Sequence, residues 1–178
     1  MFGVLRSKLV PTEAIRGMQK NGAGFAGFAT WLDMTPADAD MFAIPDPESL
    51  IQLPWKKEVG WLASDLWMSG KPVEASPRIM LKKQIERLAK RDMLLKSGVE
   101  CEYFLINPEG SSIADKKDVQ PKPCYDQSAL MRQYDLIKEI CNSMLELGWN
   151  PYQNDHEDAN GQFEMNWDYS DSLKTADR

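Results

Sequence analysis

The segment Gly98-Val99-Glu100-Cys101-Glu102-Tyr103-Phe104-Leu105 alternates acids with small or apolar residues, which is the pattern of a β-strand. Residues two apart on a strand point to the same face, about 6.6 Å from each other. Glu100 and Glu102 therefore share a face, where their carboxylates repel each other. Bound Mg²⁺ or Mn²⁺ is the simplest compensation, because these cations prefer oxygen ligands. The segment predicts a metal-binding strand.

A second acidic segment is His156-Glu157-Asp158-Ala159-Asn160-Gly161-Gln162-Phe163-Glu164, built around a hairpin dipeptide. Asn160-Gly161 is typical of a tight turn between paired strands. If the flanking strands pair, the two glutamates of this segment come together and share a face with those of the first. Four carboxylates would make a negative pocket that two divalent cations could neutralise, with coordination sites left for phosphate oxygens.

Each of these signals has a common structural interpretation when it stands alone. A Glu-x-Glu pair is more often a solvated strand edge, and an Asn-Gly pair flanked by acids is usually only a turn. His156, the single histidine, would more often be a hydrogen-bonded structural residue than a ligand. A function therefore depends on the combination of these signals with further motifs.

The first part of the chain, to about residue 73, reads as short strands with turns and one small helix. The strands are expected at 4–10, 23–32, 41–44, 50–53 and 59–67, and the helix at 11–19. Such a set predicts a small α+β domain, β-grasp-like in type, over residues 1–73.

The remainder, 74–178, alternates helices and strands. A helix should begin at Ser76-Pro77 and end near Gly98, with Leu81, Ile85, Leu88 and Leu95 on one side. The acidic strand, a polar loop over 107–124, a long helix through 131–145 that stops at Gly148, and strands at 150–155 and 162–169 follow. A further helix opens at Ser172, so the sequence reads as the incomplete start of an antiparallel-sheet α+β domain.

Composition excludes several classes of function. The net charge of −6 over 178 residues offers no basic stripe for nucleic acid. No run approaches 18 apolar residues and no signal peptide is visible, so neither a membrane partner nor export is expected. Cys101, Cys124 and Cys141 form no disulfide framework, which favours a reduced, cytoplasmic protein. Cys101 should face away from the glutamates of its strand, as a small core residue.

The two acidic segments, in this order and followed by Thr175-Ala176-Asp177, resemble the glutamine synthetase family. Other segments agree in the family's order: Pro45-Asp46-Pro47-Glu48-Ser49-Leu50, Leu53-Pro54-Trp55, Gly70-Lys71-Pro72 and Ser76-Pro77-Arg78. The resemblance covers nearly the whole chain and is nearest to the bacterial type I-like group, which includes type III members and glutamate–methylamine ligases.

The resemblance implies a ligase that uses ATP to phosphorylate the side-chain carboxylate of glutamate, after which ammonia displaces phosphate to give glutamine. By motif match, Glu102, Glu157 and Glu164 would hold one Mg²⁺ or Mn²⁺, and Glu100 the second. Tyr169 would lie near the nucleotide, and Tyr152 is a weaker match there. A homo-oligomeric ring of the complete protein is implied as well.

The chain departs from the family at its ammonium site. The usual Phe-Asp-Gly-Ser-Ser segment is missing, Phe28-Ala29-Thr30-Trp31-Leu32-Asp33 stands in its region, and Asp33 is the candidate for the same role. Methylamine therefore stays open as an alternative to ammonia. Two other readings stay open: a truncated chain that binds metal without ligase chemistry, and an unrelated two-metal hydrolase using the same carboxylates.

Overall fold

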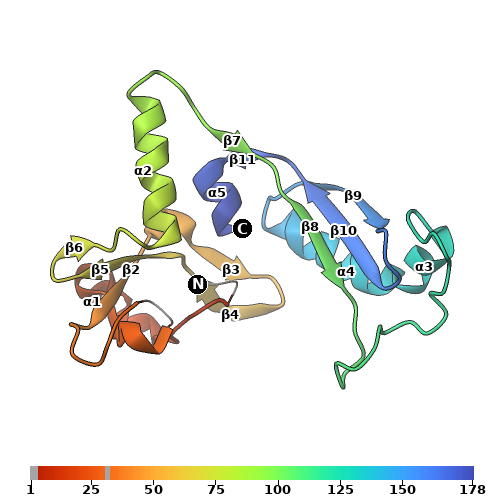
Figure 1. Cartoon of the computed structure of the whole chain (residues 1–178), viewed down its shortest axis with the longest axis horizontal. Coiled ribbons are helices and arrows are strands. Elements are labelled where there is room, and N and C mark those ends of the chain that lie inside the picture. Colours follow the sequence, from red (N-terminus) through yellow and green to blue (C-terminus); the bar gives the residue numbers. More distant parts are fainter. Residues whose placement is uncertain (1–3, 31–32) are drawn as a thin grey trace. The chain divides into compact units, whose positions relative to one another are not determined.

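The chain forms two compact units in a computed structural model, which describes residues 4–30 and 33–178 (Figure 1). The first unit comprises Met1–Leu53, Glu58–Leu95 and Asp171–Arg178, and the second comprises Pro54–Lys57 and Lys96–Ser170. The four boundaries between these segments fall at or near two short strand pairs. These are β3 (Ile51–Leu53) with β4 (Lys56–Trp61), and β7 (Lys96–Ser97) with β11 (Ser170–Asp171).

The first unit is built on a four-stranded antiparallel sheet in the order β1-β2-β5-β6. Its strands are β1 (Ala23–Phe25), β2 (Met41–Pro45), β5 (Ser64–Met68) and β6 (Lys71–Pro72). The turn η1 (Thr12–Ala14) leads into α1 (Ile15–Asn21), which contacts β2, and η2 (Gly27–Thr30) follows β1. Met41, at the start of β2, is fully buried and anchors this sheet.

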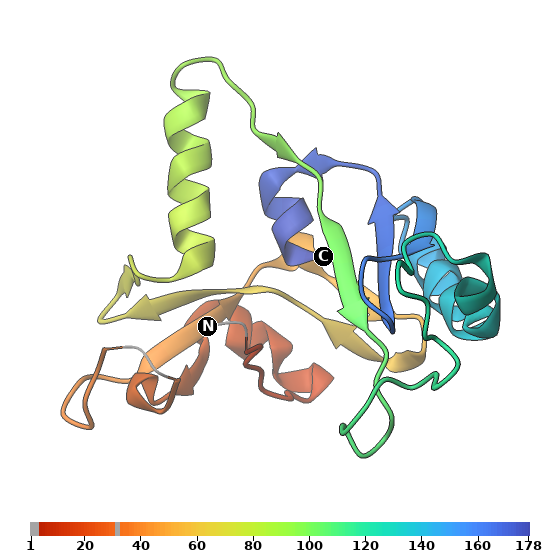
Figure 2. The same ribbon diagram turned by 45° about the vertical axis from the view of Figure 1, so that its right-hand side comes forward.

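Helices α2 (Pro77–Ala89) and α5 (Ser172–Asp177) also belong to the first unit and contact each other (Figure 2). Arg78 in α2 holds them through ion pairs to Asp177 of α5 (2.8 Å), to Asp65 of β5 (2.6 Å) and to Asp46 (2.8 Å). Asp46 also caps η3 (Pro47–Ser49), since its side chain accepts from the Glu48 amide. One partly buried guanidinium thus joins three segments distant in sequence.

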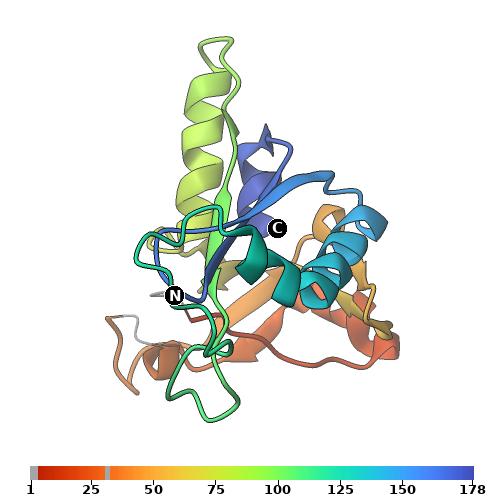
Figure 3. The ribbon, with the colours of Figure 1, turned by 90° about the vertical axis from the view of Figure 1, so that its right-hand side faces the viewer.

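The second unit has a three-stranded antiparallel sheet in the order β8-β10-β9. Its strands are β8 (Glu100–Phe104), β9 (Pro151–His156) and β10 (Gln162–Trp167). Helix α3 (Gln127–Arg132) leads almost directly into α4 (Tyr134–Glu146), and both contact β9 (Figure 3). The central strand β10 is buried nearly throughout, although half of its residues are polar.

Alternation along β10 explains this burial. Met165 and Trp167 point to the α4 side, where they pack with Met144 and, around them, Tyr103, Ile140 and Trp149. Glu164 and Asn166 point to the opposite face, because neighbouring residues of a strand alternate. One face of the sheet is therefore the hydrophobic core of the unit, and the other is lined by acids and amides.

The fold class predicted from the sequence, α+β with antiparallel sheets, is confirmed. The strands expected at 41–44, 50–53 and 150–155 and the acidic strand are found within a residue or two. The segment between β8 and α3, green to teal in Figure 2, has only an isolated bridge between Ile106 and Ile113, as expected for a loop. The assignment of domains to 1–73 and 74–178 stays a prediction.

Several expected strands differ from the structure. Residues 4–10 form no strand, and the strand expected over 23–32 covers only 23–25 before η2 begins; positions 31 and 32 lie outside the described residues. The strand expected over 59–67 is two strands, β4 and β5, because the strand is interrupted at Leu62 and Ala63 and the two parts pair in different sheets.

The helix boundaries differ too. Helix α2 ends at Ala89, well before Gly98, since Asp92 adopts a left-handed φ of 56° that a helix does not continue through. The long helix through 131–145 is divided at Gln133, whose φ of −105° interrupts the helical geometry between α3 and α4. The last helix is capped by Asp171, whose side chain accepts from the Lys174 amide, and not by Ser172.

Cys101 was expected to face away from the glutamates of its strand and to be buried, and only the first of these is correct. Cys101 lies opposite Met165, on the face away from the glutamates, but it is exposed. β8 is an edge strand of the sheet, and α4 contacts β9 at the opposite edge. Among the described residues, no helix has both the length and the apolar character needed to cross a lipid bilayer.

Candidate functional site

The polar face of the β8-β10-β9 sheet carries two rows of aligned side chains. In the first row, Glu164 of β10 lies directly opposite Glu102 of β8 and Asp155 of β9. In the second row, Asn166 lies opposite Glu100 and Gln153. Residues that face each other across an antiparallel pair have their side chains on the same side. Strand register therefore gathers Glu100, Glu102 and Glu164 on one surface.

Glu157 joins this surface from the connection that follows β9. The Glu157 amide donates to the Gln162 carbonyl (3.0 Å) and the Gln162 amide donates to the Ala159 carbonyl (2.9 Å), which closes the connection into a tight turn. Gly161 has a φ of 78°, and a Cβ at this position would lie 2.6 Å from Cγ2 of Ile113. The turn therefore requires glycine both for its backbone conformation and for its close approach to Ile113.

A buried aspartate from the long loop fastens the same turn. Asp118 accepts hydrogen bonds from the ring of His156 (2.6 Å), from the Gly161 amide (2.6 Å) and from the side chain of Asn160 (3.0 Å). Burial by itself would raise the pKa of Asp118, but these donors outweigh it and hold the pKa below its ordinary value. His156 is fully buried and lies 2.8 Å from the Glu157 carbonyl through its Nδ1, so it is a structural residue of the turn.

Three carboxylates converge at the end of the first row. One oxygen from each of Asp155, Glu157 and Glu164 lies within 4.8 Å of the others. The contact between the Glu157 and Glu164 carboxyls raises the pKa of Glu157, because two carboxyls so close to each other disfavour the charged form. Glu164 is only 8% exposed and accepts from the side chain of Asn166 (2.5 Å).

The donor set of this group fits a divalent cation. All three residues offer carboxylate oxygens, the ligands that Mg²⁺ and Mn²⁺ prefer. Among the described residues, no lysine or arginine forms an ion pair with any of the three. Oxygen Oδ1 of Asp155 is buried and has no hydrogen-bond partner. A cation would provide the missing counter-charge.

The four glutamates predicted as metal ligands take different places in this arrangement. Glu157 and Glu164 belong to the converging group. Glu102 lies beside it, opposite Glu164, and accepts from the side chain of Gln162 (2.5 Å). Glu100 is one row away, opposite Asn166. All four line a single hollow of about 420 Å³ on the polar face.

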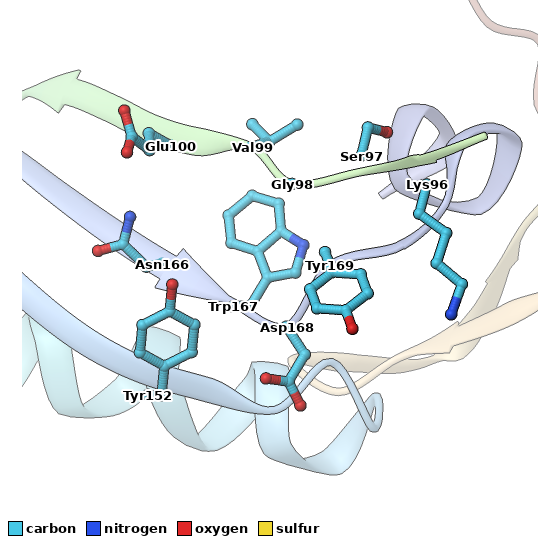
Figure 4. Close-up of a pocket in the computed structure, with 10 residues that line it drawn as sticks. All are labelled: Lys96, Ser97, Gly98, Val99, Glu100, Tyr152, Asn166, Trp167, Asp168 and Tyr169. Carbon is cyan, nitrogen blue, oxygen red and sulfur yellow. The ribbon is translucent and has the colours of Figure 1, made fainter.

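A second hollow of about 700 Å³ adjoins the first and shares Glu100, Tyr152 and Asn166 with it (Figure 4). Its wall includes Trp167, Tyr169 and Lys96, whose ammonium lies 5.4 Å from the centre of the Tyr169 ring. An aromatic wall beside a lysine suits a flat, anionic ligand. Tyr169 and Tyr152, both expected near a nucleotide, thus line the hollow next to the acids.

Two site residues were missed in the sequence, and Asp33 takes no part in the groups described above. Asp33 belongs to the first unit, so its expected role at an ammonium site stays a prediction. Asp155 could have been found, because it stands two residues before Glu157 in the same spacing as Glu100 and Glu102. Asp118 gave no signal, since its partners are 38 to 43 residues away in the chain.

Comparisons with known proteins identify the family of the chain. The sequence profile of the glutamine synthetase catalytic domain matches residues 74–178. Glutamine synthetase of Rhizobium leguminosarum bv. phaseoli is 64% identical over the whole chain, and the glutamate–methylamine ligase of Methyloversatilis universalis is 40% identical over 99% of it. The chain spans 41% of the length of each of these relatives.

A solved structure of a GmaS/ADP complex is similar to the chain in its three-dimensional fold as well. It superimposes with a TM-score of 0.96 at 68% identity, covering 99% of this chain and 41% of that one. The match to the catalytic-domain profile extends over more than half of the sequence and includes every acid of the polar face. The chain therefore belongs to the glutamine synthetase family.

Proposed function

We propose that the protein carrying this chain is an ATP-dependent ligase that joins ammonia to the side-chain carboxylate of glutamate and produces glutamine. The observation that carries the proposal is the convergence of acidic oxygens on the polar face of β8-β10-β9, next to an aromatic hollow. Its relatives named glutamine synthetase support the choice of reaction.

The reaction has two steps. A carboxylate oxygen of glutamate attacks the γ-phosphorus of ATP, the bond to the bridging oxygen breaks, and ADP and γ-glutamyl phosphate result. Ammonia then attacks the carbonyl carbon, the carbon–oxygen bond to phosphate breaks, and the nitrogen loses a proton. The first step brings two anions together, so it depends on positioning and on charge compensation.

The acids of the polar face would provide that compensation by holding Mg²⁺ or Mn²⁺. Glu157, Glu164 and the adjacent Glu102 would hold one cation beside glutamate and the transferred phosphoryl group, and Glu100 would hold another near the ATP phosphates. Bound cations supply positive charge between the reacting anions. The hydrogen bonds of Asp118 keep the turn closed and so fix the position of Glu157.

The neighbouring hollow would take the nucleotide. Tyr169 offers exposed aromatic surface, and Lys96 offers a positive charge for phosphate oxygens (Figure 4). The similar GmaS structure contains ADP, which supports a nucleotide in this family member as well. Because Glu100 lines both hollows, a cation held there would lie between nucleotide and acids.

Glu157→Ala in the complete protein tests the proposal. The variant should lose Mn²⁺-dependent formation of glutamine, by at least about 100-fold, because a ligand at the centre of the acidic group is removed. Glu109→Gln, which removes an exposed carboxylate from the loop of the same unit, should keep its activity. Retained turnover in Glu157→Ala would contradict the assignment of the metal site.

Methylamine ligation is the second candidate function. It is favoured by the 40% identity to a glutamate–methylamine ligase and by the departure from the family pattern around Asp33. The ratio of kcat/KM for methylamine to that for ammonia decides between the two amines. Absence of any ATP consumption with glutamate, either amine and Mg²⁺ present would favour instead a metal-binding chain without ligase chemistry.

Assembly and location complete the proposal. The family resemblance supports a homo-oligomeric ring of the complete protein, in which neighbouring subunits complete each other's sites. The three free cysteines support a cytoplasmic location, where thiols remain reduced.

A further inference from the structure

Asp155 is an unusual residue of the polar face, because it is acidic, 9% exposed and only half satisfied. Its Oδ2 accepts a hydrogen bond from the side chain of Gln153 at 2.9 Å. Its Oδ1 is buried without any hydrogen-bond partner. A buried carboxylate oxygen with no partner is costly, and a ligand bound to it would remove that cost.

The surroundings of Asp155 show what could bind. Strand pairing places it directly opposite Glu164, and one of its oxygens lies within 4.8 Å of oxygens from Glu164 and Glu157. Negative charges at this spacing repel one another, and among the described residues none of the three has a lysine or arginine partner in an ion pair. A bound divalent cation would remove the repulsion and satisfy the free oxygen at once.

We propose that Asp155 is a direct ligand of the divalent cation held by Glu157 and Glu164. This inference rests on the proposed function and adds to it a carboxylate that the family resemblance does not assign. Glu102 adjoins the converging group from the β8 side of Glu164, and Asp155 belongs to it from the β9 side.

The alternative is a purely structural Asp155, and the two roles predict opposite effects on the metal-free protein. A structural aspartate stabilises the fold, so its loss lowers the unfolding temperature. A metal ligand held among like charges destabilises the metal-free fold, so its neutralisation leaves the unfolding temperature equal or higher. Asp155→Asn keeps the shape of the side chain and an oxygen for Gln153, and removes only the charge.

The experiment measures binding of Mn²⁺ alone to the full chain, by the electron paramagnetic resonance signal of free Mn²⁺. Asp155→Asn should bind Mn²⁺ about tenfold more weakly, or worse, since even residues that only support a ligand contribute that much to affinity. Glu109→Gln, the matched loss of one exposed carboxylate, should bind like the parent protein. In chelator, Asp155→Asn should unfold at the same or a higher temperature, and saturating Mn²⁺ should raise that temperature less than in the parent.

Two outcomes would overturn the inference alone. Unchanged Mn²⁺ affinity in Asp155→Asn, with normal binding by the parent, would show that Asp155 does not contact the cation. A lower unfolding temperature in chelator, or failure to fold there, would show a structural role. If the parent protein itself binds no Mn²⁺ at millimolar concentration, the cation centre of the proposed function fails as well.

Discussion

Asp118 shows how much one buried residue can hold in place. Its two carboxylate oxygens accept from the His156 ring, the Gly161 amide and the Asn160 side chain, and Asp118 is only 2% exposed. We expect Asp118→Ala to lower the free energy of unfolding by about 3 kcal/mol or more, because the His156 ring and the Gly161 amide would be buried without this acceptor. Denaturant unfolding followed by circular dichroism measures the change.

Asp168→Ala is the matched control for that measurement. Asp168 is an exposed aspartate of the same unit, hydrogen-bonded at 3.3 Å from the side chain of Asn150. Its replacement should cost less than about 1 kcal/mol, as is usual for exposed contacts. Equal losses in the two variants would mean that the Asp118 hydrogen bonds contribute nothing beyond an ordinary surface contact.

The turn between β9 and β10 is the element on which the acidic group depends. We expect Gly161→Ala to lower the unfolding temperature and to weaken Mn²⁺ binding, because its Cβ would lie 2.6 Å from Ile113 and displace the turn that carries Glu157. Gly110→Ala provides a control with the same kind of backbone: Gly110 has a φ of 69° but nothing within 4 Å of a new Cβ.

The two glycine variants separate backbone strain from crowding. Both lose about 1 kcal/mol from the left-handed conformation. Only Gly161→Ala also has to move Ile113, so it should be the less stable of the two by calorimetry, and the only one with weakened Mn²⁺ binding. Equal unfolding temperatures and equal Mn²⁺ affinities would contradict the role given to the close contact.

Element boundaries were the least predictable part of the fold. Hydrophobic spacing located the helices, but it did not reveal the break at Gln133 or the early end of α2, since both depend on the backbone conformation of single residues. Alternation predicted which way Cys101 points, yet its exposure follows from the position of β8 at a sheet edge. Local sequence patterns predict which face of a strand a side chain points to and roughly where an element begins and ends. The burial of that side chain depends on neighbours that are distant in sequence.

At the scale of the whole molecule, stability should depend on pH through aspartates whose pKa is lowered in the fold. The hydrogen bond from Arg78 lowers the pKa of Asp46 in the first unit, and the donors around Asp118 lower its pKa in the second. An aspartate with a lowered pKa stabilises the fold at pH values above its pKa in the unfolded chain, about 3.9. This stabilisation is lost as the pH falls through its pKa in the folded protein.

The thermal midpoint in chelator should therefore change little between pH 7 and about 5 and fall below about pH 4. Asp118→Asn, which has no carboxylate to protonate at this position, should show a shallower fall than the parent. Parallel curves for the two proteins would argue against a lowered pKa at Asp118. Scanning calorimetry at a series of pH values makes the comparison.

Much of the candidate site could be predicted from the sequence, because its glutamates lie close to each other along the chain in two pairs. Glu100 and Glu102 share a strand, and Glu157 and Glu164 share a turn, so short-range spacing predicts each pair. The alignment of Glu164 with Asp155 depends on strand register, and the role of Asp118 depends on the path of a long loop. These long-range relations arise only when the chain is folded.

The two unlike faces of β10 have an evolutionary consequence. Insertion or deletion of one residue within Gln162–Trp167 would exchange Met165 and Trp167 with Glu164 and Asn166, and would destroy core and acidic face together. The stretch 107–112, outside every helix and strand, can gain or lose residues without that penalty. Changes of length among descendants of this chain should therefore collect in the loop and spare the strand, where selection on the core and selection on the acidic face act on the same six residues.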